Sequence, residues 1–243
     1  MRPAVRAIAP TFTDSWEGHV SWMYLDVKGL VTTGRGNLID PVTSALGLPW
    51  YHRSNNAVAR HDEIVGEWTR VKALQSMARS GGGVFAAFTD LRLSNIALDA
   101  LFYGKLDEMW TDLVKRFPCE GWCADAQLGL LSMAWALGAA FHFPKFQAAA
   151  LAGQWGVCAG PPGDASNDPS KRGESWMEDN HLPGANPANP GLHRRNLANR
   201  VLFTNALYVA HDPGTYNPDV LYYPKALGPA PAPRPPAAPA PGP

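Results

Sequence analysis

The sequence lacks any excess of charge of one sign. Its 243 residues include 21 Lys and Arg against 21 Asp and Glu, so the formal net charge is zero, and only 17% of the chain is charged. A protein that binds nucleic acid normally carries a basic surplus that neutralises phosphates. We therefore expect no nucleic-acid partner, and little long-range attraction to an anionic surface.

The sequence also lacks a long hydrophobic run and a hydrophobic leader. The longest apolar segment, Leu128 to Phe143, is interrupted by Gly, Ser and His and is too short to cross a bilayer. The segment from Met1 to Arg6 has no apolar core of the kind found in signal peptides. We therefore expect no membrane insertion, and synthesis in the cytoplasm without a signal peptide.

Cysteine is scarce, with three residues at Cys119, Cys123 and Cys158. An odd number does not suggest a closed disulfide framework. A metal site would need more ligands than the surrounding sequence offers. Buried or free thiols, a single disulfide and a metal site with additional ligands all stay open, but the expectation is that the protein holds no metal and no cofactor.

Apolar periodicity predicts an α+β fold that is mainly α, with a small N-terminal β-hairpin lobe followed by a helical lobe. The first ten residues are expected to be irregular, with a helix that begins at Thr13 or Asp14 and carries Trp16, Val20 and Met23 on one face. Short strands are expected over 24–38, with a turn at Lys28 and Gly29. The later predicted helices cover residues 55–77, a long segment after Ser94, 126–141, 146–153 and 192–210.

Composition divides the chain into two parts. Residues 1–227 are expected to form one catalytic domain, which includes a long loop or insertion over 156–190 that is rich in Gly, Pro, Asn and Asp. Residues 228–243 consist almost entirely of Pro and Ala. We expect this tail to be disordered, extended and without a core.

Glu17, Asp26 and Thr32 form the constellation that suggests chemistry. A helix followed directly by a hairpin can aim three such side chains into one cleft. Glycoside cleavage needs a carboxylic acid that protonates the leaving oxygen and a second carboxylate that handles water or the developing positive charge. Without further context, two carboxylates nine residues apart are more typical of a solvated surface, so the surrounding sequence decides the interpretation.

That surrounding sequence resembles the active-site signature of phage-type lysozymes (glycoside hydrolase family 24). The family pattern is a helical Glu, then Tyr-x-Asp, a Gly turn and Thr-x-Gly-x-Gly. Matching positions occur, in step, at Glu17-Gly18, Tyr24-Leu25-Asp26, Gly29 and Thr32-Thr33-Gly34-Arg35-Gly36. Two later segments, 127–138 and 190–203, resemble family helices more weakly, and the remainder aligns only by helix count.

The resemblance implies a lysozyme-like fold and a muramidase that cleaves the β-1,4 bond between N-acetylmuramic acid and N-acetylglucosamine. It implies Glu17 as general acid, with Asp26 and Thr32 holding water or stabilising the transition state. It also places an arginine near the acid, for which Arg194 and Arg195 are the candidates. An inverting mechanism would predict carboxyl groups roughly 6.5–9.5 Å apart.

Three positions depart from the family pattern. Arg35 stands where an apolar or aromatic residue is common, Asn37 where His is frequent, and Ala136 where the buried helix usually has Asn. We interpret Tyr24, Arg35 and Asn37 as candidate substrate-binding residues. The departures also motivate a second hypothesis, a non-catalytic wall-binding or structural module, and a third is a lytic transglycosylase.

The expected partners follow from the resemblance. They are the glycan strands of peptidoglycan and, through the Pro-rich tail, a possible delivery machinery for a monomer. The protein would then act in the periplasm or at the cell wall as a phage endolysin, a virion-associated lysin or an injected antibacterial protein.

Overall fold

The structure, a computed structural model, describes residues 1–159 and 190–228, with only the backbone described for 190–194. Most of the expected loop 156–190 and nearly all of the expected Pro/Ala tail lie outside the described residues. The predicted fold class is confirmed at the coarse level, because the chain is mainly helical with a small antiparallel sheet. No helix within the described ranges is long and apolar enough to cross a membrane.

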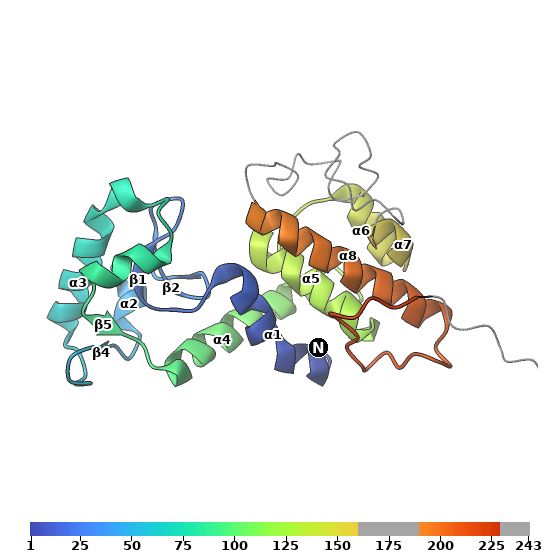
Figure 1. The fold of residues 1–243 in the computed structure, drawn as a ribbon, viewed down its shortest axis with the longest axis horizontal. Coiled ribbons are helices and arrows are strands. Elements are labelled where there is room, and N and C mark those ends of the chain that lie inside the picture. The colour runs from blue at the N-terminus through green and yellow to red at the C-terminus, as the bar shows by residue number, and fades with distance from the viewer. Residues whose placement is uncertain (160–189, 229–243) are drawn as a thin grey trace, which may run out of the picture. The chain divides into compact units, whose positions relative to one another are not determined.

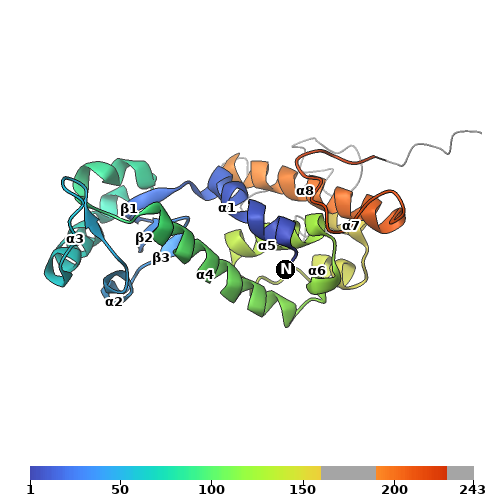
Figure 2. The same ribbon diagram turned by 90° about the horizontal axis from the view of Figure 1, so that it is seen from below.

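Figure 1 labels most of the helices and strands, and Figure 2 adds the label of β3. The helices are α1 (Pro3–Glu17), α2 (Val42–Leu46), α3 (His61–Ala73), α4 (Asn95–Val114), α5 (Ala124–Leu137), α6 (Pro144–Leu151), α7 (Trp155–Ala159) and α8 (Pro190–His211), with 3₁₀ helices η1 (Gln75–Met77), η2 (Gly82–Phe88) and η3 (Cys119–Gly121). The strands are β1 (Val20–Leu25), β2 (Val31–Gly34), β3 (Asn37–Leu38), β4 (Tyr51–His52) and β5 (Leu91–Arg92).

The predicted domain 1–227 divides into two compact units. The N-terminal unit consists of Arg6–Arg116 and Leu131–Phe141, and the C-terminal unit of Met1–Val5, Phe117–Leu130 and His142 onward. In the N-terminal unit, β1, β2 and β3 form an antiparallel sheet, and β4 pairs with β5. Buried apolar side chains from these strands, α2 and α3 form its core.

The first helix corrects the expectation of an irregular N-terminus. α1 begins at Pro3 rather than at Thr13 or Asp14, and it continues through Pro10. It ends at Glu17, so Val20 and Met23, expected on its apolar face, lie on β1 instead. Pro10 cannot donate a backbone hydrogen bond, but Val5, Ala9 and Phe12 recur at helical spacing and are all buried. Burial of these apolar side chains stabilises the helix by more than the hydrogen bond missing at Pro10 destabilises it. The burial depends on the rest of the fold, so the local sequence did not reveal it.

The C-terminal unit is built on close contact between helices. A Cβ atom added to Gly129 of α5 would lie 2.8 Å from the ring of Phe203, so only glycine lets α8 approach α5 this closely. α7 packs on α8 (Figure 1), with the rings of Trp155 and Phe203 stacked. α7 also shows that the expected loop 156–190 begins with helical residues.

All three cysteines, which belong to this unit, are free and buried. Of the possibilities left open by the sequence, the structure therefore shows buried thiols. Burial raises the pKa of the Cys119 and Cys123 thiols to about 11 and that of Cys158 to about 12. At neutral pH all three are protonated and poor nucleophiles.

Asp125, in the first turn of α5, fastens the C-terminal segment to this unit. Its carboxylate is fully buried and accepts hydrogen bonds from the backbone N–H groups of Tyr222 and Tyr223 and from the Asn205 amide. Burial raises the pKa of this carboxyl group.

We expect Asp125→Asn to lower the free energy of unfolding by about 1–3 kcal/mol, because an amide cannot accept all three bonds and leaves a buried donor unsatisfied. Denaturant unfolding followed by circular dichroism would measure the loss. Asp112→Asn is the control, since the Asp112 side chain is 60% exposed. Equal effects of the two substitutions would contradict the fastening role of Asp125.

Candidate active site

Glu17 is the last residue of α1. The helix ends there because Gly18 adopts a positive φ of 73° while its N–H still bonds the carbonyl of Asp14. Glycine takes this left-handed conformation without a steric penalty. The half-buried Glu17 carboxylate is therefore carried on a regular helix and lies at the start of the β-sheet.

The strand pairing brings the other predicted residues toward Glu17. Tyr24 of β1 lies opposite Thr32 of β2 in the antiparallel register, as the predicted hairpin requires. Burial, followed by the nearby carboxylates of Glu17 and Asp26, raises the pKa of Tyr24 to about 12. The Tyr24 phenol thus lies in the electrostatic field of both carboxylates and keeps its proton at neutral pH.

The turn between β2 and β3 lies beside the Glu17 carboxylate. Gly34 and Gly36 have positive φ values of 63° and 75°, which explains the spacing of these two glycines. A Cβ atom on Gly36 would lie 3.7 Å from Oε2 of Glu17, and the backbone of Gly36 is near enough to the Tyr24 phenol to lower its pKa against the raising effect of burial. Helix end, strand and turn therefore converge on one small region of the N-terminal unit.

Asp26 also stabilises the turn of the hairpin. Its Oδ1 accepts hydrogen bonds from the backbone N–H groups of Lys28 (2.8 Å) and Leu30 (2.9 Å), which closes the turn around Gly29. Gly29 has a φ of 73° there. Both of these hydrogen bonds use Oδ1. A chemical role for Asp26 would therefore use Oδ2, or would require the turn to lose one of its two hydrogen bonds to Oδ1.

Thr32 lies at the centre of the sheet and is only 3% exposed. Its hydroxyl donates to the carbonyl of Leu30 at 3.1 Å. A threonine hydroxyl has one donor and two acceptor lone pairs. In this arrangement it can offer a water molecule an acceptor but not its proton.

Arg35 was expected to contact substrate, but in the structure its side chain is buried and pairs with residues of the same unit. Its side chain is 5% exposed. The guanidinium pairs with both carboxylate oxygens of Asp14 and with Asp99 (3.1 Å), and it lies over the ring of Phe102. These partners join α1 and α4 to the turn, so the guanidinium has little free surface for a ligand.

Asn37, another departure from the family pattern, is likewise buried. Its Oδ1 accepts from the backbone N–H of Arg35 (3.1 Å), and its Nδ2 donates to the carbonyl of Leu101 (3.3 Å). These bonds brace the β2–β3 turn against α4, which lies beside β2 and β3 in Figure 2. We therefore withdraw the interpretation of Asn37 as a substrate contact.

The two arginines expected to support the acid lie on α8 in the C-terminal unit. Arg195 is buried there, whereas the side chain of Arg194 lies outside the described part of the chain. Their relation to Glu17 stays a prediction.

Two further side chains that sequence reasoning did not single out hold the same turn. Lys105 of α4 donates from Nζ to the carbonyl of Gly36 (3.0 Å) and lies over the ring of Trp135. Trp135 of α5 donates from its indole to the carbonyl of Arg35 (3.2 Å). Their separation from the turn by 69 and 100 residues leaves no local signal that could have revealed them.

Comparison with known proteins adds no relative: no family model, no curated protein and no solved structure matches the chain. The candidate site therefore depends on its own geometry and on the residue pattern of the hairpin.

Proposed function

We propose that the protein is a muramidase that hydrolyses the β-1,4 bond between N-acetylmuramic acid and N-acetylglucosamine in peptidoglycan. The observation that carries the proposal is the placement of Glu17 at the end of α1, with its carboxylate beside the Gly36 turn and in the same field as Asp26 at the Tyr24 phenol. Glycoside cleavage needs an acid that protonates the leaving oxygen and a second carboxylate on the same cleft, and Glu17 and Asp26 are the pair proposed for these roles.

In this proposal Glu17 protonates the glycosidic oxygen as the bond breaks. Asp26 assists the attack of water or stabilises the positive charge that develops on the sugar. Tyr24, which stays neutral because its pKa is about 12, provides a hydroxyl that is near enough to both carboxylates to be affected by their charges. The glycine turn places no side chain of its own at Gly36 beside Glu17, where a Cβ atom would lie 3.7 Å from Oε2.

A second candidate is lytic transglycosylase activity, and the geometry of Asp26 favours it. Oδ1 of Asp26 closes the hairpin turn, and the Thr32 hydroxyl is turned toward Leu30. A transglycosylase needs one acid and no water held by an Asp–Thr pair. In that case the sugar's own hydroxyl would attack, and the product would be an anhydro sugar.

Product analysis separates these possibilities. Purified peptidoglycan is digested with the full chain, and the soluble products are identified by mass spectrometry before and after borohydride reduction. Hydrolysis is expected to release muropeptides with a reducing end, because water is added across the cleaved bond. Transglycosylation would instead release products lighter by one water, which borohydride does not reduce.

Sedimentation of the protein with insoluble peptidoglycan provides the contrasting measurement. If the protein binds the wall but releases no soluble muropeptides under any condition in which it is folded, the muramidase proposal is wrong. The non-catalytic wall-binding module is then the better description.

A further inference from the structure

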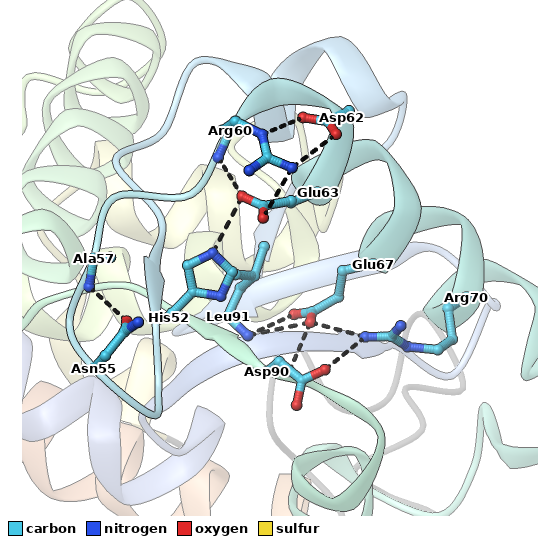
Figure 3. A network of polar contacts seen from close by, with 10 residues as sticks. All are labelled: His52, Asn55, Ala57, Arg60, Asp62, Glu63, Glu67, Arg70, Asp90 and Leu91. Carbon is cyan, nitrogen blue, oxygen red and sulfur yellow. Dashed lines mark hydrogen bonds and ion pairs between the residues drawn. The ribbon is translucent and has the colours of Figure 1, made fainter.

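A cavity of about 680 Å³ lies in the N-terminal unit between α3 and the paired strands β4 and β5. None of the residues predicted for catalysis lines it. Its ionisable lining residues are His52, Arg53, Glu63, Glu67, Arg70 and Asp90. We call it the α3–β5 pocket, and Figure 3 shows the polar network at its wall.

Glu67 forms a fixed base for this pocket. Its side chain is 2% exposed, and its carboxylate accepts from the backbone N–H groups of Asp90 (2.7 Å) and Leu91 (3.1 Å). Arg70 donates to the same carboxylate and to Asp90 (Figure 3). The base is thus held by backbone as well as side-chain bonds, so the pocket is a built feature of α3 and β5.

The Glu63 side of the pocket presents an anionic group. The Glu63 carboxylate accepts from the backbone N–H of Arg60 (2.7 Å), forms an ion pair with the exposed Arg60 guanidinium (3.2 Å) and lies 3.1 Å from Nε2 of His52 (Figure 3). The Arg60 bond, followed by His52 and the Arg60 charge, holds the pKa of Glu63 below its usual range. At neutral pH this side chain is ionised and can accept from a ligand amine.

Arg53 contributes a positive charge that no carboxylate neutralises within the described residues. Its guanidinium donates to the carbonyl of Ala86 (3.3 Å), and no ion pair joins it to an acid. Its backbone is fixed, because its N–H donates to the carbonyl of Asp90 (2.7 Å). An exposed arginine on a fixed backbone is suited to bind a carboxylate in bidentate fashion.

A pocket with an available cation and separate anions favours a ligand that carries both charges. A neutral glycan would satisfy neither group. Short peptides with free carboxylates and a free amine satisfy both, and the peptide stems of peptidoglycan have this chemistry when they contain a diamino acid. We propose that the α3–β5 pocket binds these stems, with their carboxylates at Arg53 and their amine at Glu63 and Asp90. The choice of this ligand rests on the proposed function.

Two glycines allow a matched test that spares the polar network. Gly66 of α3 lines the pocket, and a Cβ atom there meets nothing within 4 Å. Gly104 of α4 is equally unobstructed but lies outside the pocket. Glutamine at either position improves helix propensity, so we expect both variants to fold, and only Gly66→Gln to project a side chain into the pocket.

The probe is a free stem tetrapeptide, L-Ala-γ-D-Glu-meso-diaminopimelate-D-Ala, titrated into the full chain by calorimetry. We expect Gly66→Gln and Arg53→Gln to weaken binding by at least about tenfold, and Gly104→Gln to leave the affinity unchanged. A tetrapeptide with amidated carboxylates should bind more weakly than the free acid, because it cannot pair with Arg53.

In ¹⁵N-labelled protein, the peptide should shift the amide signals of Arg53, Gly66 and Asp90. The proposal is overturned if the tetrapeptide does not bind, if Gly66→Gln binds it as well as Gly104→Gln does, or if the shifted amides lie elsewhere. Because the probe contains no glycosidic bond, its binding is measured independently of cleavage. Cleavage without peptide binding refutes only the pocket, and peptide binding without cleavage refutes only the muramidase.

Discussion

Replacing Glu17 by Gln is expected to lower the rate of glycan cleavage by about 10²–10⁴-fold, the contribution typical of a positioned general acid. The amide is nearly isosteric but has no acidic proton to donate to the leaving oxygen. Because the side chain lies at the end of α1 and is half-buried, the substitution should leave the fold intact. Release of reducing ends from purified peptidoglycan measures the effect.

The matched control is Glu108→Gln, a carboxylate on the exposed face of α4 in the same unit. It should cleave peptidoglycan at the rate of the unmodified chain. If Glu17→Gln retains full activity while its circular dichroism spectrum and unfolding midpoint are unchanged, Glu17 is not the acid and the assignment of the site fails.

Arg35→Ala is expected to lower the free energy of unfolding by about 2–4 kcal/mol, because it removes a buried cation together with its packing. This decrease in the free energy of unfolding should be smaller than the decrease caused by breaking a fully buried ion pair. The side chains of Asp14 and Asp99 are 32% and 51% exposed, so both carboxylates stay hydrated when the guanidinium is gone. Denaturant unfolding measures the difference.

Two comparisons distinguish this internal role from a substrate contact. Arg79→Ala removes an exposed arginine and should change stability by no more than about 0.5 kcal/mol. In a Glu17→Gln background, which is expected to bind glycan and to cleave it far more slowly, Arg35→Ala should leave the affinity for a soluble glycan fragment unchanged. A stable Arg35→Ala variant with much weaker glycan binding would restore the earlier interpretation.

Where the pattern is local, sequence reasoning predicted the fold well. The hairpin was predicted because β-branched residues flank the turn at Gly29 and glycines punctuate the segment, and its register follows from the short turn that Asp26 closes. Ser94 caps α4 as predicted, with its side chain accepting from the backbone of Ala97. Each of these features is decided by residues no more than a few positions apart.

The start of α1 was not predictable in the same way. Pro10 indicates a break when only neighbouring residues are considered, and the helix persists because its apolar face is buried by the rest of the fold. The start of α3 was also not predictable from neighbouring residues. The helix begins at His61 rather than near residue 55, because residues 51 and 58 form a β-bridge instead.

The sequence by itself determined the placement of Glu17, Tyr24, Asp26 and Thr32, because a helix end, a tight turn and two paired strands position them within sixteen residues of one another. Only the tertiary structure decided that Arg35 and Asn37 are internal. Their partners on α4 lie 64 residues away along the chain, and whether a polar side chain faces solvent or a distant helix depends on packing that no local pattern records.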